Sequence, residues 1–311
     1  ITFSSTVDGG SNLDLLSGAG KIDIAGDVGA GTALTTLDIN ATGGSGVIEI
    51  NDVGTSSAAG VTGATAIGNT STGTLTLDGT VYTTNAATYT AATGENIDLT
   101  GGSDTAFTTS DDSITFGTGT VEMDNGSNLI IDTGTGGGAI DLAGGVMGTS
   151  SENITLTAGT GTVAIGAVGT GTEIADVSIT TTGSTTFSGD FAGASLTNTG
   201  PVIVSDNITF GTTGAINFGS TLNSSSGSQT ITFSSATDIT ITGLIGGSNP
   251  FATFTITDAD KFTYSGGGSI AGFSSGKFSR TGGFAIFNPG PSIDNINTIE
   301  KTQDKEIAFF D

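Results

Sequence analysis

One triplet recurs along this chain: an apolar residue, a polar residue and a second apolar residue. Ile208–Phe210, Ile231–Phe233 and Phe254–Ile256 are successive copies spaced 23 residues apart. Towards the start of the chain the pattern continues in steps of 19 to 27 residues. Its earlier copies are centred on Thr2, Asp23, Glu49, Thr76, Asp98, Glu122, Asp141, Ala164 and Thr186. A regular period of this size predicts a repeat architecture.

Each triplet has the alternation of a short β-strand with one buried face, because successive side chains of a strand point to opposite sides. One such strand buries too little apolar surface to be stable alone. Parallel strands stacked about 4.8 Å apart would bury the Ile, Leu, Val and Phe of each copy against the next. We therefore predict an all-β fold, a parallel β-solenoid (β-helix) of about 12–13 coils with a period near 23 residues. Such a rod would be on the order of 60 Å long.

A second series of triplets trails the first, as at Leu13–Leu15 and Leu37–Ile39. Two strands per coil and a looser third side predict a triangular or flattened cross-section. Between Ile50 and Leu75 the pattern thins, which indicates an enlarged corner or a looser coil. We expect the segment Thr80–Thr93 to be a loop whose Tyr82 and Tyr89 either serve recognition or cover an adjacent corner.

The composition changes near the end of the chain. An Asn-Pro-Gly-Pro segment at 288–291 breaks strand pairing. We therefore divide the chain into a β-solenoid rod, residues 1–285, and a C-terminal irregular cap or assembly tail, residues 286–311. Ile1 falls inside a repeat, and no signal-like segment is present. These features predict a processed product or an excised segment.

Charge and composition exclude several functions. The net charge is −24, and residues 1–260 contain a single base, Lys21, against 25 acidic residues. Such a surface repels nucleic acid and anionic membranes, so neither is an expected partner. No apolar run approaches the roughly 20 residues that span a bilayer. The chain contains no His and no Cys, so it lacks the usual activated nucleophile pairs, and we predict no enzymatic activity.

Acidic triplet centres raise the possibility of calcium binding. Carboxylates stacked at the spacing of the coils would repel one another unless they are screened or bridged by a hard cation. Solvated acids that keep the rod soluble are the alternative. Gly9–Ser17 resembles one nonapeptide of the repeats-in-toxin family, in which tandem copies bind calcium, but no second copy follows. No other cofactor is expected. The candidate calcium ligands are Asp14, Asp23, Glu49, Asp98, Glu122 and Asp141.

Threonine occupies the triplet centre in later repeats. We predict that Thr186, Thr209, Thr232 and Thr255 form an outward surface ladder. A regular array of hydroxyl and methyl groups on a solenoid resembles the ice-binding faces of some antifreeze proteins. Threonine is also a favoured outward residue in ordinary strands, so both interpretations remain open.

Segments such as 153–191, with their Gly/Thr-rich corners between short apolar triplets, resemble the repeat region of filamentous-haemagglutinin-like exoproteins. They are also similar to the passenger domains of bacterial autotransporters. The resemblance covers most of residues 1–285 and rests on the style of the repeat. It implies a secreted or surface-anchored β-solenoid from a Gram-negative bacterium that acts in adhesion or as an extracellular scaffold.

These observations predict an extracellular structural protein that assembles head-to-tail with copies of itself into a surface filament or matrix fibre. One alternative is a segment of a large secreted adhesin that binds host or surface glycans. A lesser alternative is an ice-binding β-solenoid. The candidate interface residues for assembly are Ile1, Phe3, Phe284, Phe287, Phe309 and Phe310.

Overall fold

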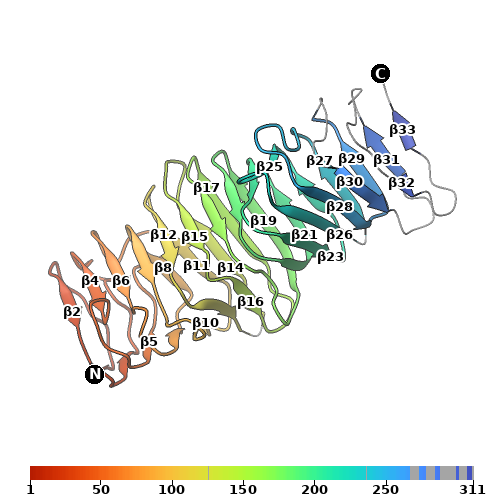
Figure 1. The fold of residues 1–311 in the computed structure, drawn as a ribbon. Helices are drawn as coiled ribbons and strands as arrows, with labels where there is room; N and C mark the ends of the chain where they lie inside the picture. Colours follow the sequence, from red (N-terminus) through yellow and green to blue (C-terminus); the bar gives the residue numbers. More distant parts are fainter. Residues whose placement is uncertain are drawn as a thin grey trace.

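The computed structural model is a rod of stacked parallel β-strands, with β1 and β2 near one end and β33 near the other (Figure 1). It describes residues 1–124, 126–235 and 237–266, and the backbone of 273–277, 284–287, 299–300 and 307–309. These residues contain no helix, and their named strands all pair in parallel. The chain winds through about 11 turns spaced about 23 residues apart. The prediction of an all-β parallel β-solenoid is confirmed, with slightly fewer turns than expected.

Three faces run along the rod, which we call A, B and C. Face A begins with a seven-stranded sheet and continues through the bridges of Val168 with Val146 and Phe191. Its strands are β1 (Thr2–Phe3), β3 (Ile22–Ile24), β5 (Ile48–Ile50), β7 (Leu75–Leu77), β10 (Asn96–Leu99), β13 (Thr120–Met123), β16 (Val146–Gly148), the start of β21 (Phe191–Asn198), β23 (Ile208–Thr212), β26 (Thr230–Ser235), β28 (Thr253–Asp258), β30 (Phe273–Lys277) and β32 (Ile299–Glu300).

Face B is a ten-stranded sheet. Its strands are β2 (Leu13–Leu15), β4 (Leu37–Ile39), β6 (Thr65–Ile67), β9 (Ala87–Tyr89), β12 (Ile114–Phe116), β15 (Ile140–Leu142), β18 (Val163–Ile165), β20 (Thr185–Phe187), β22 (Val202–Val204) and β25 (Leu222–Ser224).

Face C begins as the isolated bridges of Val7, Val28 and Val53, which lead to Tyr82. Its strands are β8 (Val81–Thr83), β11 (Thr105–Thr108), β14 (Leu129–Asp132), β17 (Ile154–Gly159), β19 (Ile174–Thr181), the end of β21, β24 (Ile216–Phe218), β27 (Asp238–Ile241), β29 (Lys261–Tyr264), β31 (Phe284–Phe287) and β33 (Ile307–Phe309). Three faces give the triangular cross-section that the second series of triplets indicated.

The core is one continuous column of apolar side chains inside the coils. On β3, Ile22 and Ile24 are buried while Asp23 between them is partly exposed. Nearly all three-residue strands repeat this alternation, which is the period of two that a strand imposes. Because each coil is covered by its neighbours above and below, a triplet that could not fold alone becomes part of a shared core.

The expectation that Thr80–Thr93 is a loop is wrong. The segment contains β8 and β9, and Tyr82 and Tyr89 are fully buried. Tyr82 stacks on Phe107 at a ring-centroid distance of 4.8 Å, and Tyr89 stacks on Phe116 at 5.3 Å. The tyrosines therefore fill the interior, where a wider coil accommodates aromatic rings, and they take no part in surface recognition. The thin region between Ile50 and Leu75 likewise contains a regular strand, β6.

Among the described residues, the last strand of face B, β25, is followed on its outer edge by a backbone loop. After β25 the chain makes one bridge, Leu222 with Ile245, and then turns through a loop at 246–250. The Leu222 N–H donates to the Leu244 carbonyl at 2.9 Å, and the Ser224 N–H donates to that of Asn249 at 3.1 Å. Faces A and C continue beyond this loop. The pairing of β32 with β30 and of β33 with β31 extends past residue 285, and the predicted cap otherwise lies outside the described residues.

Candidate functional site

The acidic candidate residues are divided between two faces. On face A the outward column runs in register through Asp23, Glu49, Thr76, Asp98 and Glu122. Asp14 and Asp141 instead lie on face B. Asp14 is aligned with Asp38, and Asp141 is aligned with Thr115 and Ala164. The column of triplet centres predicted from the sequence is thus correct from Asp23 to Glu122. It is wrong at Asp141, because the triplet of Asp141 belongs to face B and not to face A.

Asp23 and Glu49 are adjacent in the column, and Lys21 lies between them. The Lys21 Nζ is 3.8 Å from the Asp23 Oδ2 and also donates a hydrogen bond to Glu49. The bond to Glu49 raises the pKa of Lys21 above its usual value. The only base of residues 1–260 therefore screens this carboxylate pair, which removes the need for a bridging cation there.

Asp98 and Glu122 form a second carboxylate pair without a base. They line a hollow of about 130 Å³ together with Thr100 and Asp124. Burial, followed by the charges of Glu122 and Asp124, raises the pKa of Asp98 to about 6. The Asp98 Oδ1 is buried and has no hydrogen-bond partner among the described residues. Asp98 therefore holds its proton more tightly than an isolated aspartate would, which lowers the repulsion with its acidic neighbours.

Metal binding gains no support from this arrangement. Within residues 1–124, 126–235 and 237–266, no group of three or more acidic side chains is placed to hold a metal ion. The Asp141 Oδ1 accepts a hydrogen bond from the Ala143 N–H at 2.9 Å, which is a local turn contact. Among the acids proposed as calcium ligands, Lys21 screens Asp23 and Glu49, a local hydrogen bond engages Asp141, and Asp98 has a raised pKa.

The threonine ladder is real but shorter than predicted. Thr209, Thr232 and Thr255 are aligned on face A through β23, β26 and β28. Thr186 is not part of it, because β20 belongs to face B, where Thr186 lies between Ala164 and Ile203. Thr186 and Thr209 are 23 residues apart, like the successive triplets of one face, so the spacing alone could not show that they lie on different faces.

The predicted interface residues lie at opposite ends of the rod. Ile1 is 49% exposed and Phe3 is half-buried at the β1 end. Phe284 and Phe287 belong to β31, in register with Lys261 and Tyr264, and Phe309 on β33 is in register with Phe287. Phe310 lies outside the described residues. The structure therefore separates the two sets, as an end-to-end contact would require.

A polar ladder escaped the sequence reasoning. It follows five successive coils: three members come immediately before β11, β14 and β17, and two lie within β19 and β21. Its members are Asp104, Asn128, Asn153, Asp176 and Ser195. The Asn128 amide donates to Asp104 at 2.7 Å, and the Asn153 amide donates to Asn128 at 3.0 Å. The Asp176 N–H donates to Asn153 at 3.0 Å, and the Ser195 hydroxyl donates to Asp176 at 2.6 Å. The ladder fixes the corner of five successive coils.

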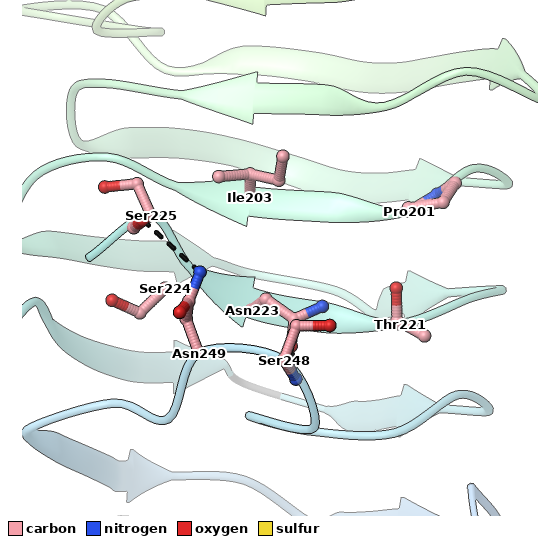
Figure 2. Close-up of a pocket in the computed structure, with 8 residues that line it drawn as sticks. All are labelled: Pro201, Ile203, Thr221, Asn223, Ser224, Ser225, Ser248 and Asn249. Atoms are coloured by element: carbon pink, nitrogen blue, oxygen red, sulfur yellow. Dashed lines mark hydrogen bonds between the residues drawn. The ribbon is translucent and has the colours of Figure 1, made fainter. Parts of the chain in front are cut away.

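A groove of about 410 Å³ lies on face B at the transition from β25 to the capping loop (Figure 2). Sequence reasoning missed it, because its residues come from three successive coils. The Gly-Gly-Ser-Asn-Pro segment at 246–250 was the available signal, since it marks a loop in place of a strand. The groove is lined by Pro201, Ile203, Thr221, Asn223, Ser224, Ser225, Ser248 and Asn249.

No protein-family model, curated protein or solved structure matches the chain. A membrane-crossing helix is also absent from the residues that the structure describes.

Proposed function

We propose that this chain is a non-enzymatic, extracellular structural protein, a stiff rod whose outer columns of side chains meet partners. The observation that carries the proposal is the parallel pairing that runs from β1 to β32 along face A. Inter-strand hydrogen bonds and one continuous core make the coils mechanically interdependent. The absence of cysteine and the acidic, Gly/Thr/Ser-rich surface support a place outside the cell.

The geometry of the β1 edge supports the proposal of head-to-tail association. The N–H of Asp23 donates to the carbonyl of Ile1, and the N–H of Ala25 donates to the carbonyl of Phe3. In a parallel pair the residue between them, Thr2, directs its own N–H and C=O to the opposite side. Asp14 on β2 is placed in the same way. This edge would accept a further coil, either of the same polypeptide or of a second copy.

Electron microscopy and sedimentation of the purified chain test the association. We expect rods that join end to end as the concentration rises. Thr2→Pro combined with Asp14→Pro removes two outward N–H groups from edge strands, where proline is tolerated, and should leave single rods. Thr2→Val combined with Asp14→Asn keeps both N–H groups and should still assemble. Single rods at every concentration for the unmodified chain would contradict the head-to-tail proposal.

A further inference from the structure

We propose that the groove beside β25 binds a neutral oligosaccharide. The groove lies where the face-B sheet ends and the loop 246–250 replaces the next strand (Figure 2). Its volume of about 410 Å³ falls within the range of about 300–1,000 Å³ that is usual for small-molecule sites. The proposal concerns one side of the rod and does not depend on end-to-end association.

The lining offers many neutral hydrogen-bonding groups and no charged ones. The amide oxygen of Asn223 accepts a hydrogen bond from the Ser248 N–H at 3.1 Å. This bond occupies the oxygen, while the amide nitrogen of Asn223 has no partner among the described residues. The hydroxyls of Thr221, Ser225 and Ser248 are likewise without a protein partner there. Amides and hydroxyls that can both donate and accept match the hydroxyl groups of a sugar.

Two aliphatic residues supply the apolar part of the groove. Ile203 is the central residue of β22, on the neighbouring coil, and Pro201 comes immediately before that strand (Figure 2). Ile203 interrupts an outward column that is otherwise mostly polar or small, between Thr186 and Asn223. An apolar patch beside converging polar groups is the usual composition of a ligand site. Here it would contact the C–H face of a sugar ring.

The rim of the groove is held in place by a hydrogen-bond network. The Gly227 N–H donates to the Ser224 hydroxyl at 2.8 Å, and the Gln229 amide donates to the Ser205 carbonyl at 3.4 Å. The Asn249 amide donates to the Ser225 carbonyl, also at 3.4 Å (Figure 2). A rim ordered before binding reduces the entropy that a ligand must overcome.

Charge selects a neutral ligand over an anionic one. The lining has no cationic side chain to pair with a sulfate or carboxylate. The net charge of −24 would also repel an anionic polysaccharide as it approaches. An uncharged saccharide avoids both penalties, and its hydroxyl groups can hydrogen-bond to the amides and hydroxyls of the lining.

Saturation-transfer difference NMR on the whole chain tests the proposal, with tri- and tetrasaccharides of glucose, galactose and N-acetylglucosamine as probes. We expect at least one probe to receive saturation, and the saturated fraction of that probe to fall as its concentration is raised to a large excess. Asn223→Asp should weaken that binding about tenfold, since it replaces the unpartnered amide donor with a charged acceptor. Asn217→Asp is the matched control, because Asn217 is the exposed central residue of β24 on face C.

Thr221→Val provides a second variant, which removes one hydroxyl while preserving shape. It should weaken binding several-fold and leave the circular dichroism spectrum unchanged. The proposal is overturned if no neutral probe receives saturation, or if Asn217→Asp weakens binding as much as Asn223→Asp and Thr221→Val. Stronger binding of a sulfated trisaccharide than of its neutral parent would also overturn it.

Discussion

At the scale of single residues, the pKa values of two carboxylates that are wholly or partly buried shift in opposite directions. Glu152 is fully buried, and its carboxylate accepts hydrogen bonds from the N–H groups of Gly126 and Ser150, both at 2.9 Å. The Ser150 hydroxyl adds a third at 2.7 Å. Burial alone would raise the pKa of Glu152, but these hydrogen bonds outweigh burial and lower it. Asp98 lacks comparable donors, and its pKa rises.

Replacing Glu152 should destabilise the fold. Glu152→Ala removes the charged acceptor of the Gly126 and Ser150 N–H groups and of the Ser150 hydroxyl, and should cost about 2 kcal/mol in the free energy of unfolding, measured by urea denaturation. Glu173→Gln, an exposed change in the neighbouring coil, should change it by less than about 0.5 kcal/mol. Equal effects of the two substitutions would show that the hydrogen bonds accepted by Glu152 contribute nothing to the free energy of unfolding.

The contribution of Glu152 should also depend on pH. Its pKa is lower in the folded state than the ordinary glutamate value of 4.5. The stabilisation is therefore fully present above that value and is lost as the pH falls through the folded-state pKa. The stability difference between the unmodified chain and Glu152→Gln should be constant near pH 7 and shrink below about pH 4. A difference that grows in acid would contradict this sign.

Asp98 should show the opposite dependence. Its pKa of about 6 lies above the ordinary value of 3.8, so the folded state becomes less stable as the pH rises between these values. Asp98→Asn should therefore stabilise the chain at pH 7 by about 1 kcal/mol, allowing for solvent screening. The gain should vanish near pH 3.5. Urea unfolding at both pH values measures it, and a gain that is independent of pH would exclude titration of Asp98 as the cause.

At the scale of elements, aromatic rings stack from coil to coil in the second half of the rod. Phe210 on β23 has ring-centroid distances of 5.2 Å to Phe187, 5.6 Å to Phe218 and 5.5 Å to Phe233. These rings come from all three faces, so one side chain joins strands that are distant in sequence. Edge-to-face and stacked pairs add to the effect of burial.

Removing the Phe210 ring should open this part of the core. Phe210→Ala should lower the free energy of unfolding by about 3–5 kcal/mol. Thr209→Ala, on the outward side of the same strand, should change it by no more than about 0.5 kcal/mol. Denaturant titration of both variants measures the contrast. Similar losses would mean that the strand is held by its backbone pairing alone.

The sequence predicts the strands of this fold better than their faces. A triplet such as Ile22–Ile24 shows which side chains point inward, because alternation is local. The triplet does not show which of the three faces the strand occupies. The corners that connect the strands differ in length, so the face cannot be counted from the spacing. Asp141 and Thr186 were therefore placed on the wrong face. The burial of Tyr82 is not visible in the sequence, because β8 has its single buried residue at the centre, flanked by Val81 and Thr83, the reverse of the usual triplet.

The groove and the polar ladder could not be predicted from the sequence either, because each is formed by residues from several coils. The groove joins residues of three coils, as with Pro201, Asn223 and Asn249, and the ladder joins five. Their alignment depends on the length of every intervening corner. The capping loop at 246–250 could be recognised as a loop from its Gly and Pro content, but its role in covering the face-B edge required the pairing of β25.

At the scale of the whole molecule, the rod is a column of registered coils whose length grows with the number of coils. Its cross-section is triangular as far as the loop 246–250; beyond it the strands that the structure describes belong to faces A and C, which extend to β32 and β33 (Figure 1). A rod of this kind resists bending because every coil is bonded to both neighbours, and that property underlies the proposed structural role.

Distances between pairs of spin labels test this architecture most directly. The chain has no cysteine, so labels can be placed on introduced cysteines without background. Asp23, Met147 and Ser234 lie in one outward column of face A. With about 4.8 Å per strand, electron–electron double resonance should give about 24 Å between labels at 23 and 147, and about 43 Å between labels at 23 and 234. A second distance equal to or shorter than the first would contradict the solenoid rod.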